Sequence, residues 1–162
     1  MFTTQQIANW FIARENFDML TDNNHEKTTQ MRLHKFLYYA QGYFLAIYDE
    51  QLFDDKIVAY THGPLVLGLF EKYSGTKDIE IADDLTEKVA DDYHDVSSNE
   101  DAFNVLEYVY DKYNNLTTGQ LRNQTHKEDP WKNHESNLSM NEKILPKEMQ
   151  DYFKKSLATV FK

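Results

Sequence analysis

The most regular spacing of apolar residues in the chain lies between residues 29 and 48. Apolar side chains recur there every three or four positions, which places them on one face of an α-helix. Tyrosines flank that face, so we expect a central helix of a bundle, with the tyrosines packed in or near the core. The apolar positions are Leu33, Phe36, Leu37, Ala40, Phe44 and Ile47, and the tyrosines are Tyr38, Tyr39 and Tyr43.

The segment before this helix predicts another one. Thr3 and Gln6 have the spacing of a capping box, in which each side chain binds a free backbone N–H at the start of a helix. The apolar face that follows continues to about Asn16. Residues 20–28 are polar and turn-rich, which indicates a connecting loop.

The segment after the central helix predicts a short β element. Residues 57–61 are rich in β-forming side chains, and Gly63 and Pro64 interrupt them. Because proline suits the first turn of a helix, we expect Pro64 to begin a third helix over residues 65–73.

Three more helices are predicted in the second half of the chain, after a weakly patterned acidic stretch at residues 76–97. One is capped by Ser97 or Ser98, a short one covers residues 118–125, and the last covers residues 146–161, with Pro146 in its first turn. The apolar face of the first of these helices is Phe103, Leu106, Val109 and Tyr110. The apolar face of the last is Met149, Phe153, Leu157, Val160 and Phe161. These patterns predict a mainly α fold, a compact multi-helix bundle forming a single domain over residues 1–162.

Composition supports this picture and narrows the chemistry. With 162 residues, of which 41% are hydrophobic, the chain is long enough for one domain with its own core. It contains no cysteine, which excludes disulfides, thiolate nucleophiles and cysteine-ligated zinc. Neither a secretory leader nor an apolar run of about 18 residues is visible, so we expect a soluble, cytoplasmic protein without a membrane partner.

The acidic charge is concentrated in one stretch. The net charge is −10, and residues 71–111 account for it, since they hold 13 Asp or Glu and three Lys. Such a surface repels phosphate, so direct nucleic-acid binding is not expected, and a regulator with a basic helix-turn-helix face is disfavoured. The same field would speed encounter with a basic partner. This stretch is either a solubilising surface or a partner-binding face, for which the candidates are Asp83, Asp84, Asp91, Asp92 and Asp95.

Motifs that carry catalysis are absent from the sequence. The six histidines form no HExxH pattern, and neither a GxSxG elbow nor a P-loop is present. The nearest approach to a metal cluster is the run from Asp91 to Asp95 with His94, and such charge runs are usually solvated. We therefore expect no enzyme, no cofactor, no metal and no catalytic residue.

Two clusters are less easily dismissed. Lys35 interrupts the apolar central helix, so its ammonium either snorkels to the surface or pairs with a carboxylate or a carbonyl. Further along, His62, His126 and Trp131 lie in two short polar and aromatic tracts. The alternative to a pure binding protein is an enzymatic or ligand-binding pocket that gathers Lys35 with these three side chains, and the test is whether they converge in space.

Four motifs, in this order, resemble the Panacea domain, also called the SocA-like or phage-associated protein (genetic element protein A) family. They are Met31 to Gly42 around Lys35-Phe36-Leu37-Tyr38-Tyr39, the pair Leu52-Phe53, the run Ile57 to Val66 through His62-Gly63-Pro64, and Leu121 with Thr125-His126 and Pro130-Trp131. Spacing and order hold over about residues 4–135. Departures are Tyr60 in place of tryptophan, Leu65 in place of valine and His34 in place of glutamine.

The resemblance implies a mainly helical domain with a small β element. Members are frequent in prophages, and many resemble antitoxins that neutralise a neighbouring-gene toxin by direct protein contact. It implies a cognate protein toxin as partner, which we expect to be basic, and a homo-oligomer is compatible with it. No catalytic residue is carried over, and the matching residues are expected to be mostly structural: Leu33, Lys35, Leu37, Tyr38, Gly63, Pro64, Thr125, His126 and Trp131.

Overall fold

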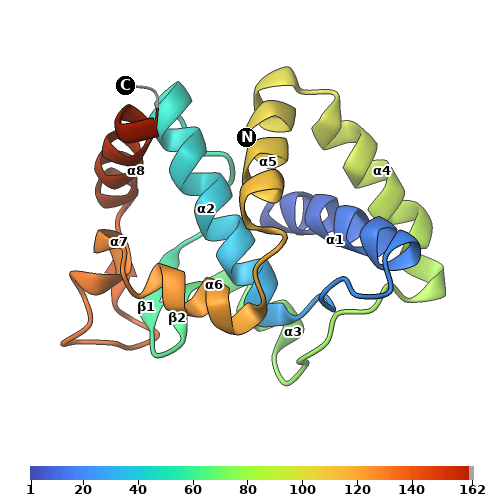
Figure 1. Cartoon of the computed structure of the whole chain (residues 1–162), viewed down its shortest axis with the longest axis horizontal. Helices are drawn as coiled ribbons and strands as arrows, with labels where there is room; N and C mark the ends of the chain where they lie inside the picture. The colour runs from blue at the N-terminus through green and yellow to red at the C-terminus, as the bar shows by residue number, and fades with distance from the viewer. Residues whose placement is uncertain (161–162) are drawn as a thin grey trace.

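A computed structural model describes residues 1–160 as eight α-helices, one 3-10 turn and a small sheet (Figure 1). In chain order the elements are α1 (Thr4–Thr21), α2 (Gln30–Tyr48), β1 (Ile57–Tyr60), β2 (Gly63–Val66), α3 (Leu67–Tyr73), η1 (Asp83–Leu85), α4 (Thr86–Ser97), α5 (Glu100–Tyr113), α6 (Thr118–Thr125), α7 (Asp129–Lys132), β3 (Lys143–Ile144) and α8 (Pro146–Val160). The predicted mainly helical bundle with a small β element is confirmed. Within residues 1–160, no helix combines the length and the apolar character that crossing a membrane requires.

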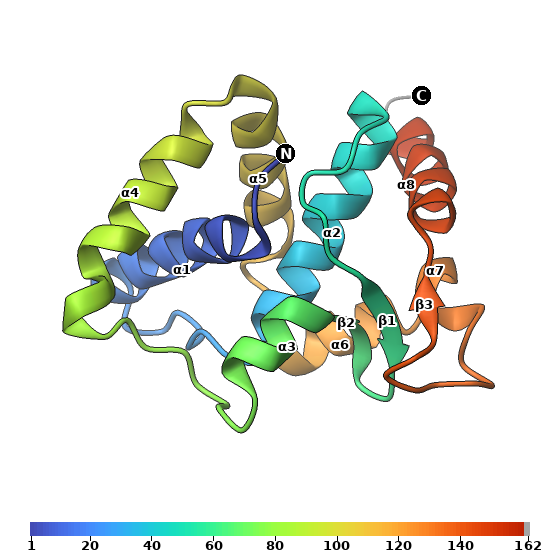
Figure 2. The same cartoon turned by 180° about the vertical axis from the view of Figure 1, so that it is seen from behind.

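Helix α2 is the centre of the fold, as its apolar pattern predicted. Every residue from Arg32 to Leu45 is buried, and the helix packs against α8 on one side and against α1 and α5 on the other (Figures 1 and 2). Thr29 caps its first turn through a bond from the Arg32 N–H. The predicted core tyrosines are confirmed, but the predicted apolar position Ile47 is 47% exposed.

Polar side chains of α2 fasten the neighbouring segments to it. The Gln41 amide accepts the Leu52 N–H at 2.7 Å and donates to the Phe53 carbonyl at 2.8 Å. His34 Nδ1 accepts the Val66 N–H at 3.0 Å, so its Nε2 carries the proton and donates to Gln30. Burial, reinforced by the charge of Lys35, lowers the pKa of His34 to about 3, so this histidine is neutral and structural.

The sheet lies beside the N-terminal half of α2, near α6 and α3 (Figure 2). Its strands are antiparallel in the order β2-β1-β3, with Ala59 opposite Pro64 and Tyr60 opposite Gly63. The prediction that Pro64 begins a helix is wrong, because Pro64 lies in β2 and α3 begins at Leu67. Strand β2 is at the edge of the sheet, where a residue without a backbone N–H is tolerated.

The helices α1 and α4 differ most from the sequence expectation. The capping box of Thr3 and Gln6 is confirmed, but α1 continues to Thr21, five residues past the predicted end. Helix α4 forms inside the stretch that appeared weakly patterned. Its buried face consists of Val89, Asp92 and Val96, and the charged residue in the middle hides the helical spacing.

The remaining helices agree with the predicted positions, with local corrections. The N-cap of α5 is Asn99 rather than Ser97 or Ser98. Its predicted apolar residue Phe103 is 36% exposed, whereas Leu106, Val109 and Tyr110 are buried. Helix α8 begins at Pro146 as predicted, with Met149 and Phe153 buried. The expected contributions of the Val160 side chain and Phe161 lie outside the described residues.

Candidate functional site

The family-motif residues gather around the turn between β1 and β2. Gly63 has a φ of 108°, and a Cβ on it would lie 2.7 Å from Thr125 Oγ1 and 2.9 Å from Lys35 Cε. Thr125 Oγ1 donates to the Arg122 carbonyl at 2.8 Å, and the Trp131 indole N–H donates to the Tyr60 carbonyl at 2.7 Å. The motif therefore joins α2, the sheet, α6 and α7 at one point.

Gly63→Ala is expected to destabilise the fold more than Gly75→Ala. Both glycines have positive φ, 108° and 79°, so alanine at either costs about 1–3 kcal/mol of backbone strain. Only at Gly63 does the new Cβ also meet side chains, since nothing lies within 4 Å at Gly75. That crowding adds about 1–3 kcal/mol. Denaturant unfolding of both variants measures the difference, and equal losses would mean that Lys35 and Thr125 do not crowd this turn.

Lys35 is buried beneath the same turn. It is 1% exposed, and its ammonium donates to the Pro64 carbonyl at 3.4 Å. Snorkelling is therefore wrong, and pairing with a carbonyl is the alternative that the structure confirms. Burial, with a smaller contribution from the charge of Arg122, lowers the pKa of Lys35 to about 7.

His126 lies face to face on Trp131, with ring centroids 3.8 Å apart and planes 4° from parallel. Its Nε2 atom is buried without a hydrogen-bond partner among residues 1–160. Burial lowers the pKa of His126, and the charges of Arg122, Lys35 and His62 lower it further. Because Trp131 is covered by this ring and bound to the sheet, it positions His126 rather than facing a ligand.

His62 completes a cluster of basic groups. It is exposed, and its Nδ1 accepts a hydrogen bond from Arg122 Nε at 3.2 Å. Lys35, His62 and His126 are thus brought to one turn, but the cavity beside it is lined by His62 and not by Lys35, His126 or Trp131, so the single shared pocket of the alternative hypothesis is not formed there. Sequence reasoning missed Arg122, although it lies four residues before His126 and therefore on the same face of α6.

The other motif residues form the core below this cluster. Leu33, Leu37 and Tyr38 are fully buried. The hydroxyls of Tyr38 and Tyr39 both donate to the Glu128 carboxylate at 3.1 Å, which ties α2 to the start of α7. Burial raises the pKa of Glu128 to about 7, against the opposing effect of these hydrogen bonds.

The candidate acidic face is exposed at four of its five positions. Asp83 and Asp84 lie in η1, and Asp91 and Asp95 on α4, all exposed to solvent. Asp92 is a correction: it is 1% exposed and accepts hydrogen bonds from Asn9 Nδ2 at 2.7 Å and from Lys88 Nζ. It faces α1 because Val89 and Val96, three and four residues away, turn that side of α4 inward.

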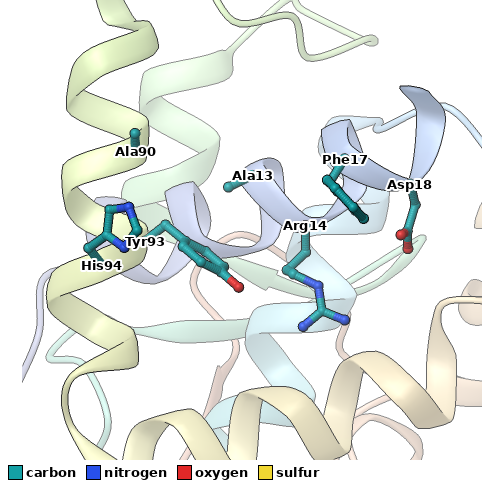
Figure 3. A pocket seen from close by; sticks show the side chains of 7 residues that line it. All are labelled: Ala13, Arg14, Phe17, Asp18, Ala90, Tyr93 and His94. Atoms are coloured by element: carbon teal, nitrogen blue, oxygen red, sulfur yellow. The ribbon is translucent and has the colours of Figure 1, made fainter. Parts of the chain in front are cut away.

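A groove of about 520 Å³ lies between α1 and α4 beside this face (Figure 3). Tyr93 reaches from α4 toward the side of α1 that bears Arg14, Phe17 and Asp18, and Ala13 of α1 and Ala90 of α4 also line the groove. Phe17 is 62% exposed, although it is a large apolar side chain. The Arg14 guanidinium is paired with Glu107, so its charge is already compensated.

Acidic residues border this groove on α4. Glu87, Asp91 and Asp95 follow each other at intervals of four, so they form one exposed stripe. That stripe is adjacent to the groove residues Ala90 and His94 on the helix surface. Exposed apolar surface bordered by a single sign of charge is an arrangement suited to binding a protein segment of opposite charge.

Comparison with known proteins identifies the family. Neither the curated proteins nor the solved structures contain a match to this chain. A family model described as antitoxin SocA-like, Panacea domain, matches residues 33–132. This segment runs from α2 to the end of α7, and it contains every motif residue around the β1–β2 turn from Leu33 to Trp131. The chain therefore belongs to the SocA-like antitoxin family that carries the Panacea domain.

Proposed function

We propose that this protein is the antitoxin of a toxin–antitoxin pair and neutralises a toxin encoded by a neighbouring gene through direct contact. The observation that carries the proposal is the match to an antitoxin family over residues 33–132. Its role is binding rather than catalysis. Because a toxin and its antitoxin meet in the cell that makes both, the pair belongs in the cytoplasm.

The contact surface that we assign to the toxin is the α1/α4 groove with its acidic border. Leu20 is 78% exposed and Phe17 62%, so α1 offers two apolar side chains for burial. Full burial of one such side chain is worth about 1.5–3 kcal/mol. The stripe of Glu87, Asp91 and Asp95 would attract a basic toxin segment and raise its rate of association.

Coexpression with the neighbouring gene tests the proposal. The neighbouring gene product is expected to stop growth alone and to be harmless with this protein present. A mixture of the two purified proteins is expected to elute as one complex in size-exclusion chromatography. A neighbour that is harmless by itself, or a toxin neutralised without complex formation, would contradict direct neutralisation.

Substitutions in the groove are expected to abolish protection without unfolding the protein. Phe17→Ser removes the apolar anchor and is expected to weaken toxin binding by about 10- to 100-fold. Asp91→Lys with Asp95→Lys is expected to slow association and to reverse its dependence on salt. Binding kinetics at two salt concentrations measure both effects.

The matched control is Glu50→Lys with Asp54→Lys, the same charge change at two exposed positions in the loop after α2. It is expected to leave binding unchanged. Equal losses in the groove and control variants would place the contact elsewhere. Asp92 is left intact because it is buried between α1 and α4.

A further inference from the structure

Basic groups without acidic partners meet at the β1–β2 turn, in a protein whose net charge is −10. Of the three arginines, Arg14 and Arg32 each pair with a glutamate. Arg122 instead donates to His62, and within residues 1–160 no carboxylate lies within 4 Å of Arg122, His62 or Lys35. A cluster of basic groups that the fold leaves without a carboxylate is suited to an anion from outside.

The hydrogen-bond donors of this cluster are available. Because Arg122 Nε donates to His62 Nδ1, the proton of neutral His62 is on Nε2, and His62 is exposed. The two terminal nitrogens of Arg122 have no protein acceptor in the part of the chain that the structure describes. A guanidinium with free terminal N–H groups binds two oxygens of a phosphate or a carboxylate at once.

Buried groups below add to the preference for an anion. The Lys35 ammonium is 1% exposed and has one long hydrogen bond, to Pro64. His126 presents a buried Nε2 without a partner. Burial, and to a smaller degree the neighbouring positive charges, disfavours the protonated forms of both groups, and an oxyanion nearby would favour those forms.

An apolar cavity of about 360 Å³ adjoins His62. Its walls include Met31 from α2, Tyr60 and Leu65 from the sheet and Phe70 from α3. Its volume is within the range of small-molecule sites, and His62 is shared between the cavity and the basic cluster.

We propose that this end of the molecule binds a small phosphorylated organic ligand, with the phosphate on Arg122 and His62 and the apolar part in the adjoining cavity. Phosphate is favoured over a carboxylate because its second negative charge more strongly favours the protonated forms of Lys35 and His126 below it. The site lies apart from the α1/α4 groove, so it is independent of the toxin contact.

Titration of the purified chain with two probes tests the site. The NMR signals of the histidine rings report the binding. Inorganic phosphate is expected to shift the His62 and His126 signals in a saturable way. Phenyl phosphate, which adds an apolar group, is expected to bind about tenfold more tightly or better, since burying a phenyl ring is worth more than 1.4 kcal/mol. Equal affinity for the two probes would overturn the assignment.

Variants separate the two halves of the site. Arg122→Gln is expected to weaken the binding of both probes by about 10- to 100-fold, because it removes charge-assisted hydrogen bonds. Phe70→Ala is expected to weaken the binding of phenyl phosphate but not that of inorganic phosphate. Lys155→Gln, which removes an exposed charge from α8, is expected to change neither. Equal shifts in the wild type and Arg122→Gln would overturn the proposal, and the experiment needs no toxin.

Discussion

Arg32→Leu is expected to lower the free energy of unfolding by about 3–5 kcal/mol, the cost of leaving one member of a buried ion pair alone. Arg32 and Glu15 are both fully buried, and the guanidinium pairs with the Glu15 carboxylate. It also donates to the carbonyls of Asn114, at 2.6 Å, and Leu116. One side chain of α2 therefore connects this helix to α1 and to the loop between α5 and α6. Leucine in its place donates no hydrogen bond to the Glu15 carboxylate or to the two carbonyls.

The loss is expected to be larger at pH 8 than at pH 5. Burial already raises the pKa of Glu15 above its usual value, and Arg32 is the main group that opposes this effect; His25 opposes it weakly and Asp18 adds to it. Without Arg32 the pKa rises further in the folded state. Glu15 therefore stays protonated to a higher pH in the folded variant than in the folded wild type. The deficit of the variant grows as the pH rises above the wild-type pKa of Glu15, because beyond that point only the variant must ionise a buried carboxyl group without a partner.

The double variant Arg32→Leu with Glu15→Leu provides the control. It removes the lone buried charge, so it is expected to recover part of the loss and to show a weaker dependence on pH. Urea unfolding at pH 5 and pH 8 measures all three proteins. A single variant as stable as the wild type, or a double variant that is no better than the single one, would contradict this account.

Phe153→Ala is expected to cost about 3–5 kcal/mol, the range for a buried phenylalanine. Phe153 is 1% exposed, and its ring contacts those of Tyr38, Tyr43 and Tyr152 at centroid distances of 4.7 to 5.5 Å. It also lies directly on the backbone of α2, since a Cβ on Gly42 would be 2.2 Å from the ring. Helix α8 is outside the matched family segment, yet this contact makes it part of the core.

Gly42→Ala provides the matching test from the other side. Alone, it forces Phe153 away from α2 and is expected to destabilise by about 1–3 kcal/mol. Combined with Phe153→Ala, the new methyl group enters space that the ring has left. The double variant is therefore expected to be more stable than the sum of the two single effects predicts. Thermal and urea unfolding measure the coupling, and strict additivity would show that the two residues do not touch.

The scaffold could be predicted from sequence because its signals are local and periodic. The spacing of Leu33, Phe36 and Leu37 predicts a helix, and the capping box of Thr3 and Gln6 fixes the start of another. The same reasoning fails for polar residues that are buried, because periodicity assigns them to the surface. Asp92 has the side chain of a surface residue, but its partner Asn9 is 83 positions away in the chain.

The candidate sites show the same limit. Lys35, His62 and His126 could be selected because they are unusual in their local sequence. The spacing of Arg122 from His126 was the only local signal for it, since its role depends on His62, 60 residues earlier, and on the absence of a nearby carboxylate among the described residues. The α1/α4 groove was also unforeseen, because it depends on how two helices from distant parts of the chain pack against each other.

The buried carboxylate of Asp92 has a consequence for how such a protein can change over time. With Val89 and Val96, it fixes α4 to α1 through the inner side of the helix. The outward positions Glu87, Asp91 and Asp95 contribute little to that attachment, and surface substitutions of this kind usually alter stability by about 0.5 kcal/mol or less. Mutation can therefore change this stripe almost without penalty to folding, so the proposed toxin contact can change its specificity while the scaffold stays the same.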